Sequence, residues 1–113
     1  MRSQRDRLLD ILGSIDEINE FASLGRDAYV RDKLIQGWMI LQLQRIGEAA
    51  AHLSEAVRRE CPHIPWQDIV GMRNLLIHEY FGISPARVWM TVVNDVPVLK
   101  ECVSRILENL GEP

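Results

Sequence analysis

The sequence predicts an all-α fold, an up-and-down bundle of four to five helices in one domain. Apolar residues recur at spacings of three and four along most of the 113 residues, whereas the strict alternation typical of a half-buried strand is missing. Hydrophobic residues make up 47% of the chain and charged residues 26%, as in ordinary globular domains. A chain of this length can bury a core of its own. No apolar run approaches the roughly 18 residues that a membrane span requires.

The first predicted helix covers residues 3–22. Its apolar positions lie on one face, with Asp and Glu on the other: Leu8, Ile11, Leu12, Ile15, Ile18, Phe21 and Ala22. Gly25 is suited to a left-handed C-cap after this helix, and Asp27 is a suitable N-cap for the next.

The second predicted helix is long, covering residues 28–60, and it carries two stripes. One is a continuous apolar seam: Ile35, Met39, Leu43, Ile46, Ala50, Leu53 and Val57. The other begins with four apolar residues and then turns polar: Val30, Leu34, Trp38, Leu41, Arg45, Glu48 and His52. A helix with two apolar faces needs two neighbours, so either a bundle or a dimer is expected.

Two further helices follow a proline-rich break at Pro62 and Pro65. The third is predicted over residues 66–80 and ends before Gly82. Ser84 and Pro85 fit the N-cap and first turn of a fourth helix. Its apolar repeat consists of Val88, Val92, Val96, Leu99, Val103, Ile106 and Leu110. Pro97 predicts a kink or a split near residues 94–95.

Charge and cysteine content narrow the classes of function. The formal net charge of −3 argues against a protein that coats nucleic acid, but it leaves room for a small phosphate-binding site. The N-terminus lacks the apolar core of a signal peptide. Cys61 and Cys102 form no close-spaced ligand pair, so we expect reduced thiols in a cytoplasmic protein.

The segment from Arg73 to Tyr80 contains the candidate chemistry, because polar groups interrupt a pattern otherwise typical of a buried helix. Arg73 offers a fork of donors suited to phosphate, and His78 can exchange a proton near neutral pH. On a straight helix Tyr80 falls over Arg73, and Asn74 lies one turn before His78. The structural alternative is that Arg73 pairs with an acidic neighbour on a solvated face and His78 ends the helix.

The polar part of the second stripe allows two interpretations. Arg45, Glu48 and His52 form either a solvated ion-pair stripe or the second wall of a polar pocket facing the third helix. No set of residues with metal-ligand spacing is present, since His63 beside Cys61 lacks a second pair. We therefore predict no metal and no cofactor.

A site without a metal is better suited to RNA than to DNA, because RNA supplies its own nucleophile, the 2′-hydroxyl. Such a site needs a base, an acid and a cation. One chain has a single motif histidine, so we expect a composite site at a homodimer interface, where two copies of Arg73 and His78 meet. The alternative is a non-catalytic module that binds a nucleotide or docks a nucleotidyltransferase.

Arg-x4-His-x-Tyr at Arg73–Tyr80, followed by Phe81 and Gly82, resembles the signature of the HEPN superfamily, and in particular its HepT-like ribonuclease toxins. The resemblance extends to Ile46-Gly47-Glu48-Ala49, Ile64-Pro65-Trp66, Gly71-Met72-Arg73-Asn74 and Val88-Trp89, and it covers nearly the whole chain.

This resemblance implies a helical bundle that dimerises and cleaves RNA without a metal, through Arg73 and His78 with Asn74 as a polar neighbour. It also implies a toxin–antitoxin pair whose antitoxin is a minimal nucleotidyltransferase. Tyr80 would be the acceptor for AMP groups that block the site. Glu79 places a negative charge beside His78.

Overall fold

The computed structural model describes residues 2–74 and 84–111, and all regular structure in these ranges is helical. Its elements are α1 (Gln4–Ala22), α2 (Arg26–Arg31), α3 (Lys33–Ala51), α4 (Glu55–Arg59), α5 (Trp66–Gly71), the 3-10 turn η1 (Met72–Asn74), α7 (Pro85–Met90), the π-helical turn η3 (Thr91–Asp95) and α8 (Val96–Leu110). None of the described helices has the length and apolarity needed to cross a bilayer.

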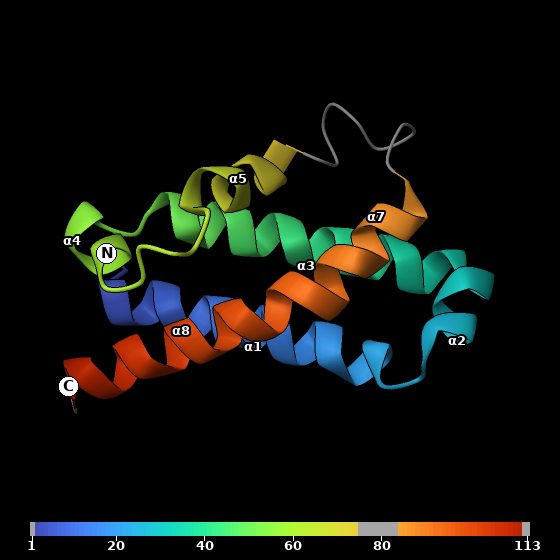
Figure 1. Ribbon diagram of the computed structural model, residues 1–113, viewed down its shortest axis with the longest axis horizontal. Helices are drawn as coiled ribbons and strands as arrows, with labels where there is room; N and C mark the ends of the chain where they lie inside the picture. Colours follow the sequence, from blue (N-terminus) through green and yellow to red (C-terminus); the bar gives the residue numbers. More distant parts are fainter. Residues whose placement is uncertain (1, 75–83, 112–113) are drawn as a thin grey trace.

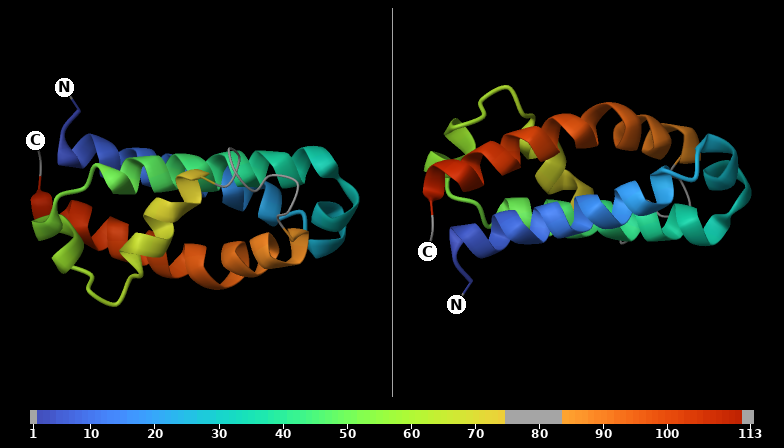
Figure 2. Two further views of the ribbon diagram at one scale, coloured as in Figure 1. Left: turned by 90° about the horizontal axis from the view of Figure 1, so that it is seen from above. Right: turned by 90° about the horizontal axis from the view of Figure 1, so that it is seen from below.

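Helix α1 lies beside both α3 and α8, and these three helices form what we call the bundle body (Figure 1). The chain runs along α1, returns along α3, reverses through α5 and returns again through α7 and α8, which is the up-and-down order expected from the sequence (Figure 1). Helix α5 and turn η1, which we call the motif seat, cross one face of the body between α3 and α8 (Figure 2). The predicted fold class is therefore confirmed.

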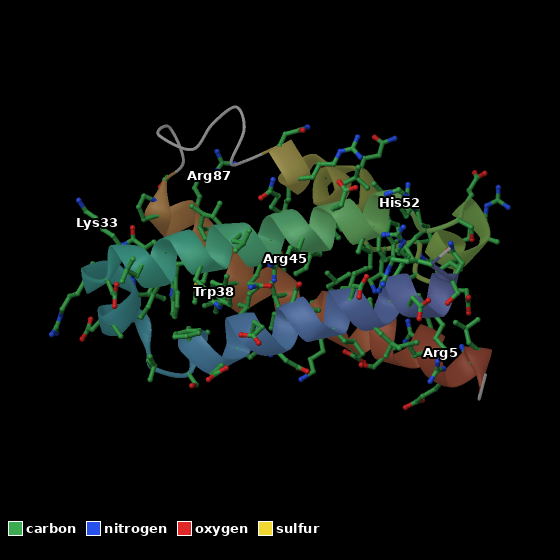
Figure 3. All side chains as sticks on the ribbon, turned by 180° about the vertical axis from the view of Figure 1, so that it is seen from behind. Arg5, Lys33, Trp38, Arg45, His52 and Arg87 are labelled. Carbon is green, nitrogen blue, oxygen red and sulfur yellow. A yellow bond between two sulfur atoms is a disulfide. The ribbon has the colours of Figure 1, made fainter. Side chains whose placement is uncertain are left out.

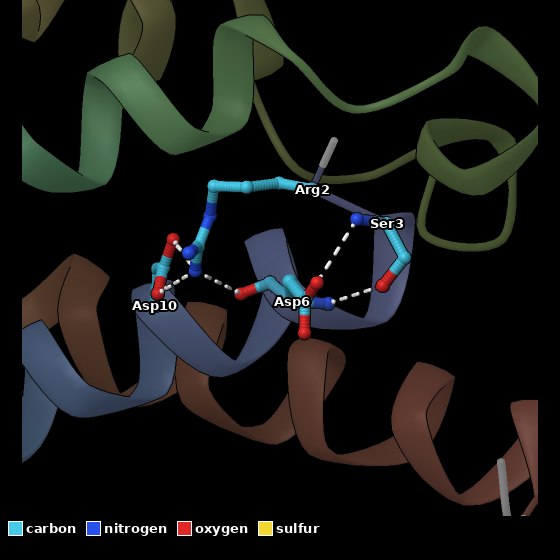
Figure 4. Close-up of polar contacts among 4 residues, drawn as sticks. All are labelled: Arg2, Ser3, Asp6 and Asp10. Carbon is cyan, nitrogen blue, oxygen red and sulfur yellow. Dashed lines mark hydrogen bonds and ion pairs between the residues drawn. The ribbon is translucent and has the colours of Figure 1, made fainter.

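Helix α1 begins at a reciprocal cap. The Ser3 hydroxyl accepts a hydrogen bond from the Asp6 amide, and the Ser3 amide donates to the Asp6 carboxylate, each at 3.0 Å (Figure 4). The backbone hydrogen bond from Ser3, reinforced by its hydroxyl, lowers the pKa of Asp6. Arg2 forms an ion pair with Asp10 one turn further along (Figure 4). The two hydrogen bonds between Ser3 and Asp6 satisfy amide groups that the start of the helix leaves without partners.

The long second helix predicted over residues 28–60 is interrupted at two places. Asp32 is extended and accepts a hydrogen bond from the Leu34 amide at 2.8 Å, so it caps α3 rather than continuing α2. Ser54 caps α4 in the same way, through the Val57 amide at 3.2 Å. Asp27 lies in the first turn of α2, whose N-cap is Gly25 with a φ of 95°. Every member of the apolar seam is nonetheless buried, including Leu53, which lies in the break between α3 and α4.

The split predicted near Pro97 is confirmed. Ser84 caps α7, the backbone widens into η3, and α8 begins at Val96 with Pro97 in its first turn. Proline has no amide hydrogen to donate to the preceding turn, so the wider π turn accommodates the missing bond. The apolar repeat is buried from Val88 to Ile106, and Leu110 is exposed.

The prediction of reduced cysteines is wrong. Cys61, between α4 and α5, and Cys102, on α8, form a disulfide with their Cα atoms 6.3 Å apart. Both residues are buried, and the Arg105 guanidinium lies 3.3 Å from the Cys61 sulfur. The partners are 41 residues apart in sequence, so no local spacing revealed the pair. The disulfide covalently joins the loop before α5 to α8 of the bundle body.

Candidate functional site

The motif seat begins at Trp66, whose side chain is held both by burial of its ring and by hydrogen bonds from its ring nitrogen. The ring is buried, and its Nε1 donates hydrogen bonds to the carbonyl oxygens of Arg58 at 3.0 Å and Cys61 at 3.1 Å. A buried indole N–H needs such acceptors. Because Cys61 is also bonded to α8, the start of α5 has a defined position relative to α4 and to the bundle body.

Turn η1 rests directly on the backbone of α3 at Gly47. A Cβ atom added there would lie 2.7 Å from both the Arg73 amide nitrogen and the Ile69 carbonyl oxygen. One turn earlier on α3, Gln44 Nε2 donates a hydrogen bond to the Arg73 carbonyl oxygen at 3.2 Å. The amide and the carbonyl of Arg73 are therefore both held against α3, while the residue as a whole is exposed.

Of the residues predicted for catalysis and modification, the structure describes Arg73, and it also describes Asn74, which was predicted as its polar neighbour. Arg73 and Asn74 are adjacent in η1, and both are exposed. His78 and Tyr80, together with Glu79, lie outside the described residues. The third helix predicted over residues 66–80 is represented by α5 and η1 up to Asn74. Within the described ranges no ion pair joins Arg73 to Asp68, the nearest acidic residue before it in the sequence.

Arg45 and Glu48, which were predicted as supporting residues, lie on α3, and His52 is the C-cap of this helix. His52 Nε2 is 3.2 Å from Glu48 Oε1, and both side chains are about half exposed, as in the solvated ion-pair interpretation. Arg45 is exposed and lies on the side of α3 that faces away from α5 (Figure 3). Successive residues are about 100° apart around a helix, so Gln44 meets η1 while Arg45 does not.

Gln44 and Gly47 were not among the predicted site residues. A glycine inside a long helix is unfavourable by about 1 kcal/mol relative to alanine, and such a position often marks close packing. That signal was present at Gly47. Nothing in the sequence indicated that the partner would be the backbone of Arg73, because this requires knowing how α5 crosses α3.

A cleft of about 840 Å³ lies between the motif seat and the α7–α8 segment. Its described lining includes apolar groups from α3, α7 and α8 and polar groups from α5 and α7, among them Leu43, Ile46, Leu99, Asp68 and Arg87. Met72 of η1 also lines it, whereas Arg45 and Glu48 do not. The wall that α3 gives to this cleft is therefore apolar.

No cluster of three or more His, Cys, Asp or Glu residues suited to a metal ion occurs within residues 2–74 and 84–111. The neighbouring His63 and Cys61 are not a ligand pair, because the Cys61 sulfur is bonded to Cys102. At the end of the seat the structure thus describes two exposed polar groups next to each other in sequence, the Arg73 guanidinium and the Asn74 amide.

Comparison with known proteins places the seat in a wider context. A family profile described as Ribonuclease HepT-like matches residues 11–106. The chain is 39% identical over 100 residues to a probable ribonuclease HepT of Thermococcus cleftensis, covering 88% of this chain and 91% of that one. It is 38% identical over 95 residues to a candidate RNase of Methanocaldococcus jannaschii, covering 83% and 87%. A candidate RNase of Caldanaerobacter subterraneus is 32% identical over 109 residues, covering 96% and 97%. No solved structure matches the chain.

Proposed function

The chain belongs to the HepT-like ribonuclease family, and we propose that it is a metal-independent endoribonuclease toxin whose active site is shared between two copies of the chain. The observation that carries the proposal is the seating of Arg73. Its backbone is held at both the amide and the carbonyl, while the residue itself is exposed. A preorganised cation at the surface is what a phosphate in RNA would require.

In the proposed reaction His78 of one copy removes the proton of a ribose 2′-hydroxyl. The oxygen then attacks the adjacent phosphorus, the bond from phosphorus to the 5′-oxygen breaks, and the second His78 protonates that leaving oxygen. Arg73 neutralises the additional charge on the phosphate, and Asn74 orients it. The products carry a 2′,3′-cyclic phosphate and a 5′-hydroxyl.

An exposed apolar surface supports the proposed homodimer. On α2 and α3, Val30 is 58% exposed and Leu34 is 84% exposed. The stripe continues along α3 through the partly buried Trp38 and Leu41 before it reaches Arg45. A second copy could cover these residues through a two-fold interface, in which Arg45 and Glu48 would be supporting polar groups at its edge.

A nucleotidyltransferase antitoxin is the proposed partner. It would transfer AMP from ATP to the Tyr80 hydroxyl and release pyrophosphate. The added phosphate would compete with RNA for Arg73 and add negative charge at the site. In cells that contain the partner, Tyr80→Phe should therefore restore growth arrest. Continued neutralisation of Tyr80→Phe would contradict this part of the proposal.

The catalytic proposal is tested with purified protein and labelled RNA in excess chelator. We expect cleavage to 2′,3′-cyclic ends, and a loss of cleavage of at least about 100-fold in Arg73→Ala and in His78→Ala, with the fold retained. Variants as active as the parent would show that the residues are wrongly assigned. Cleavage that stops when the chelator is added would exclude the metal-independent mechanism.

The interface is tested by Leu34→Lys, with Leu9→Lys on α1 as a matched control, since Leu9 is also an exposed leucine. Both variants should fold, and the free energy of unfolding of each monomer should lie within about 0.5 kcal/mol of that of the parent monomer. We expect Leu34→Lys alone to sediment as a monomer and to lose RNase activity. A Leu34→Lys variant that still dimerises would show that this stripe is not the interface.

The net charge of −3 favours one alternative, a non-catalytic module that docks a nucleotidyltransferase. It predicts tight binding of the partner by a protein that leaves RNA intact in the same assay.

A further inference from the structure

We propose that Gly47 and Gln44 of α3 are positioning residues for Arg73, an inference that rests on the proposed ribonuclease function. Gly47 would set how closely the Arg73 backbone approaches α3, and Gln44 would fix the direction in which the Arg73 carbonyl points. Neither side chain needs to touch RNA. Both would act through the placement of the Arg73 guanidinium.

The contact at Gly47 is between two backbones, so it has little room to adjust. The Arg73 amide nitrogen and the Ile69 carbonyl oxygen both lie 2.7 Å from where an alanine Cβ would be, and the Met72 carbonyl carbon lies at 3.3 Å. Ordinary contact begins at 3.4 Å, so η1 would have to move away by roughly 0.7 Å. Gly13, in the middle of α1, has nothing within 4 Å of the same position.

Gln44 provides the second constraint. Its Nε2 donates to the Arg73 carbonyl oxygen at 3.2 Å, on the same side of α3 as Gly47. Two turns earlier, Gln36 makes the same kind of bond at the other end of the helix, donating to the Tyr29 carbonyl oxygen at 3.0 Å and the Val30 carbonyl oxygen at 3.2 Å. Among the contacts that the structure describes, the Gln44 side chain thus holds Arg73, whereas the Gln36 side chain holds the end of α2.

These two contacts fix the peptide groups on both sides of the Arg73 Cα atom. Once the two peptide planes are set, the direction of the Cα–Cβ bond follows, and the guanidinium has only its side-chain rotations left. A displacement of about 1 Å of a charge-stabilising group can reduce the rate of a reaction about 100-fold. The approach of η1 to α3 is thus a determinant of rate rather than of RNA affinity.

The first experiment compares Gly47→Ala with Gly13→Ala in RNA cleavage by the full-length dimer. We expect kcat to fall roughly 100-fold in Gly47→Ala with KM changed by less than about threefold. Gly13→Ala should keep the parent values of both constants. A loss confined to KM, or parent kcat in Gly47→Ala, would overturn the role of Gly47.

The second experiment compares Gln44→Met with Gln36→Met, which remove the donor while retaining a side chain of similar length. Loss of one hydrogen bond that aligns Arg73 should reduce kcat about fivefold in Gln44→Met, while Gln36→Met keeps the parent kcat. This pair also decides the proposal if Gly47→Ala fails to fold, and equal kcat in the two methionine variants would then overturn it.

The same assays separate this inference from the function on which it rests. If Arg73→Ala cleaves RNA as well as the parent, the catalytic role of Arg73 is wrong, whatever the α3 variants do. If Arg73→Ala is inactive while Gly47→Ala and Gln44→Met keep the parent kcat, the ribonuclease assignment stands and the positioning role is wrong.

Discussion

The bundle body and the motif seat are held together by different forces. In the body, α1, α3 and α8 pack through apolar side chains that are fully buried, such as Ile11, Ile15, Met39 and Val103. The seat contributes less apolar burial and relies on a backbone contact at Gly47, a hydrogen bond from Gln44, the Trp66 ring and one disulfide. Burial of apolar area is non-directional, whereas close backbone contact and hydrogen bonds depend on exact geometry.

This difference indicates that stability and the placement of Arg73 are largely separate properties. The body can lose a methylene group and adjust, at a cost in free energy of unfolding. The seat can lose its alignment by a fraction of an ångström with little change in buried area. Substitutions of the same chemical kind should therefore act differently in the two regions, and four predictions test this.

The largest expected effect is that of reducing the disulfide, which joins the two regions. The Cys61–Cys102 bond closes a loop with a sequence separation of 41 that contains α5, η1 and α7. Loss of a cross-link of this loop length should lower the free energy of unfolding by about 4 kcal/mol, because the unfolded chain regains entropy. Urea unfolding with and without a dithiol reductant measures the change. The Cys61→Ala, Cys102→Ala double variant is the control and should not respond to the reductant.

Truncation of isoleucine should cost more in the body than in the seat. Ile15 on α1 is completely buried, and Ile15→Ala should lower the free energy of unfolding by about 3–4 kcal/mol. Ile69 on α5 is 9% exposed at the edge of the cleft, so Ile69→Ala should cost only about 2 kcal/mol. Equal costs in denaturant unfolding would show that the seat is packed as tightly as the body.

A smaller effect is expected at Tyr29, where α2 meets α7. Its hydroxyl donates to the Pro85 carbonyl oxygen at 2.7 Å, so Tyr29→Phe should cost about 1 kcal/mol. Burial raises the pKa of the Tyr29 phenol above its ordinary value. A raised pKa means that the fold favours the neutral phenol, so this contribution is complete below about pH 10 and is lost as the pH rises through the folded-state pKa.

Unfolding measured from pH 8 to pH 11 checks the sign of this effect. The parent should lose stability more steeply than Tyr29→Phe above pH 10. If the variant declines as steeply as the parent, the alkaline loss arises elsewhere, for instance at the one other tyrosine or at the lysines.

The body was easier to predict from sequence than the seat, because periodic apolar patterns encode which face of a helix is buried. All seven members of the predicted seam are buried, including Leu53 between α3 and α4, even though the single helix proposed for them is interrupted at Asp32 and Ser54. Those interruptions were missed because both caps are polar residues within a pattern that otherwise continues. The split predicted from Pro97 was correct, because proline lacks an amide hydrogen and so interrupts helical hydrogen bonding wherever it occurs.

The seat was harder to predict, because its contacts join residues far apart in sequence. Arg45 and Glu48 were chosen from the polar stripe of α3, but the residues that contact η1 are Gln44 and Gly47. The offset of one residue between Gln44 and Arg45 corresponds to about 100° of rotation, and the crossing of α5 over α3 sets which face is used. The disulfide was missed for the same reason. The roles of Arg73, Asn74, His78, Tyr80, Arg45 and Glu48 stay predictions.

The smallest expected effect has the opposite sign and compares the regions most directly. Gly13→Ala, within the exposed face of α1, should raise the free energy of unfolding by about 0.5–1 kcal/mol, because alanine loses less backbone entropy in a helix. Alanine at Gly47 has the same entropic advantage, but it forces η1 away from α3. The net effect of Gly47→Ala should therefore be a lower free energy of unfolding. Thermal and denaturant unfolding of the two single variants measure the sign of each change in the free energy of unfolding. Stabilisation by Gly47→Ala would mean that η1 moves away from α3 without cost, and the distinction between body and seat would then fail at its central contact.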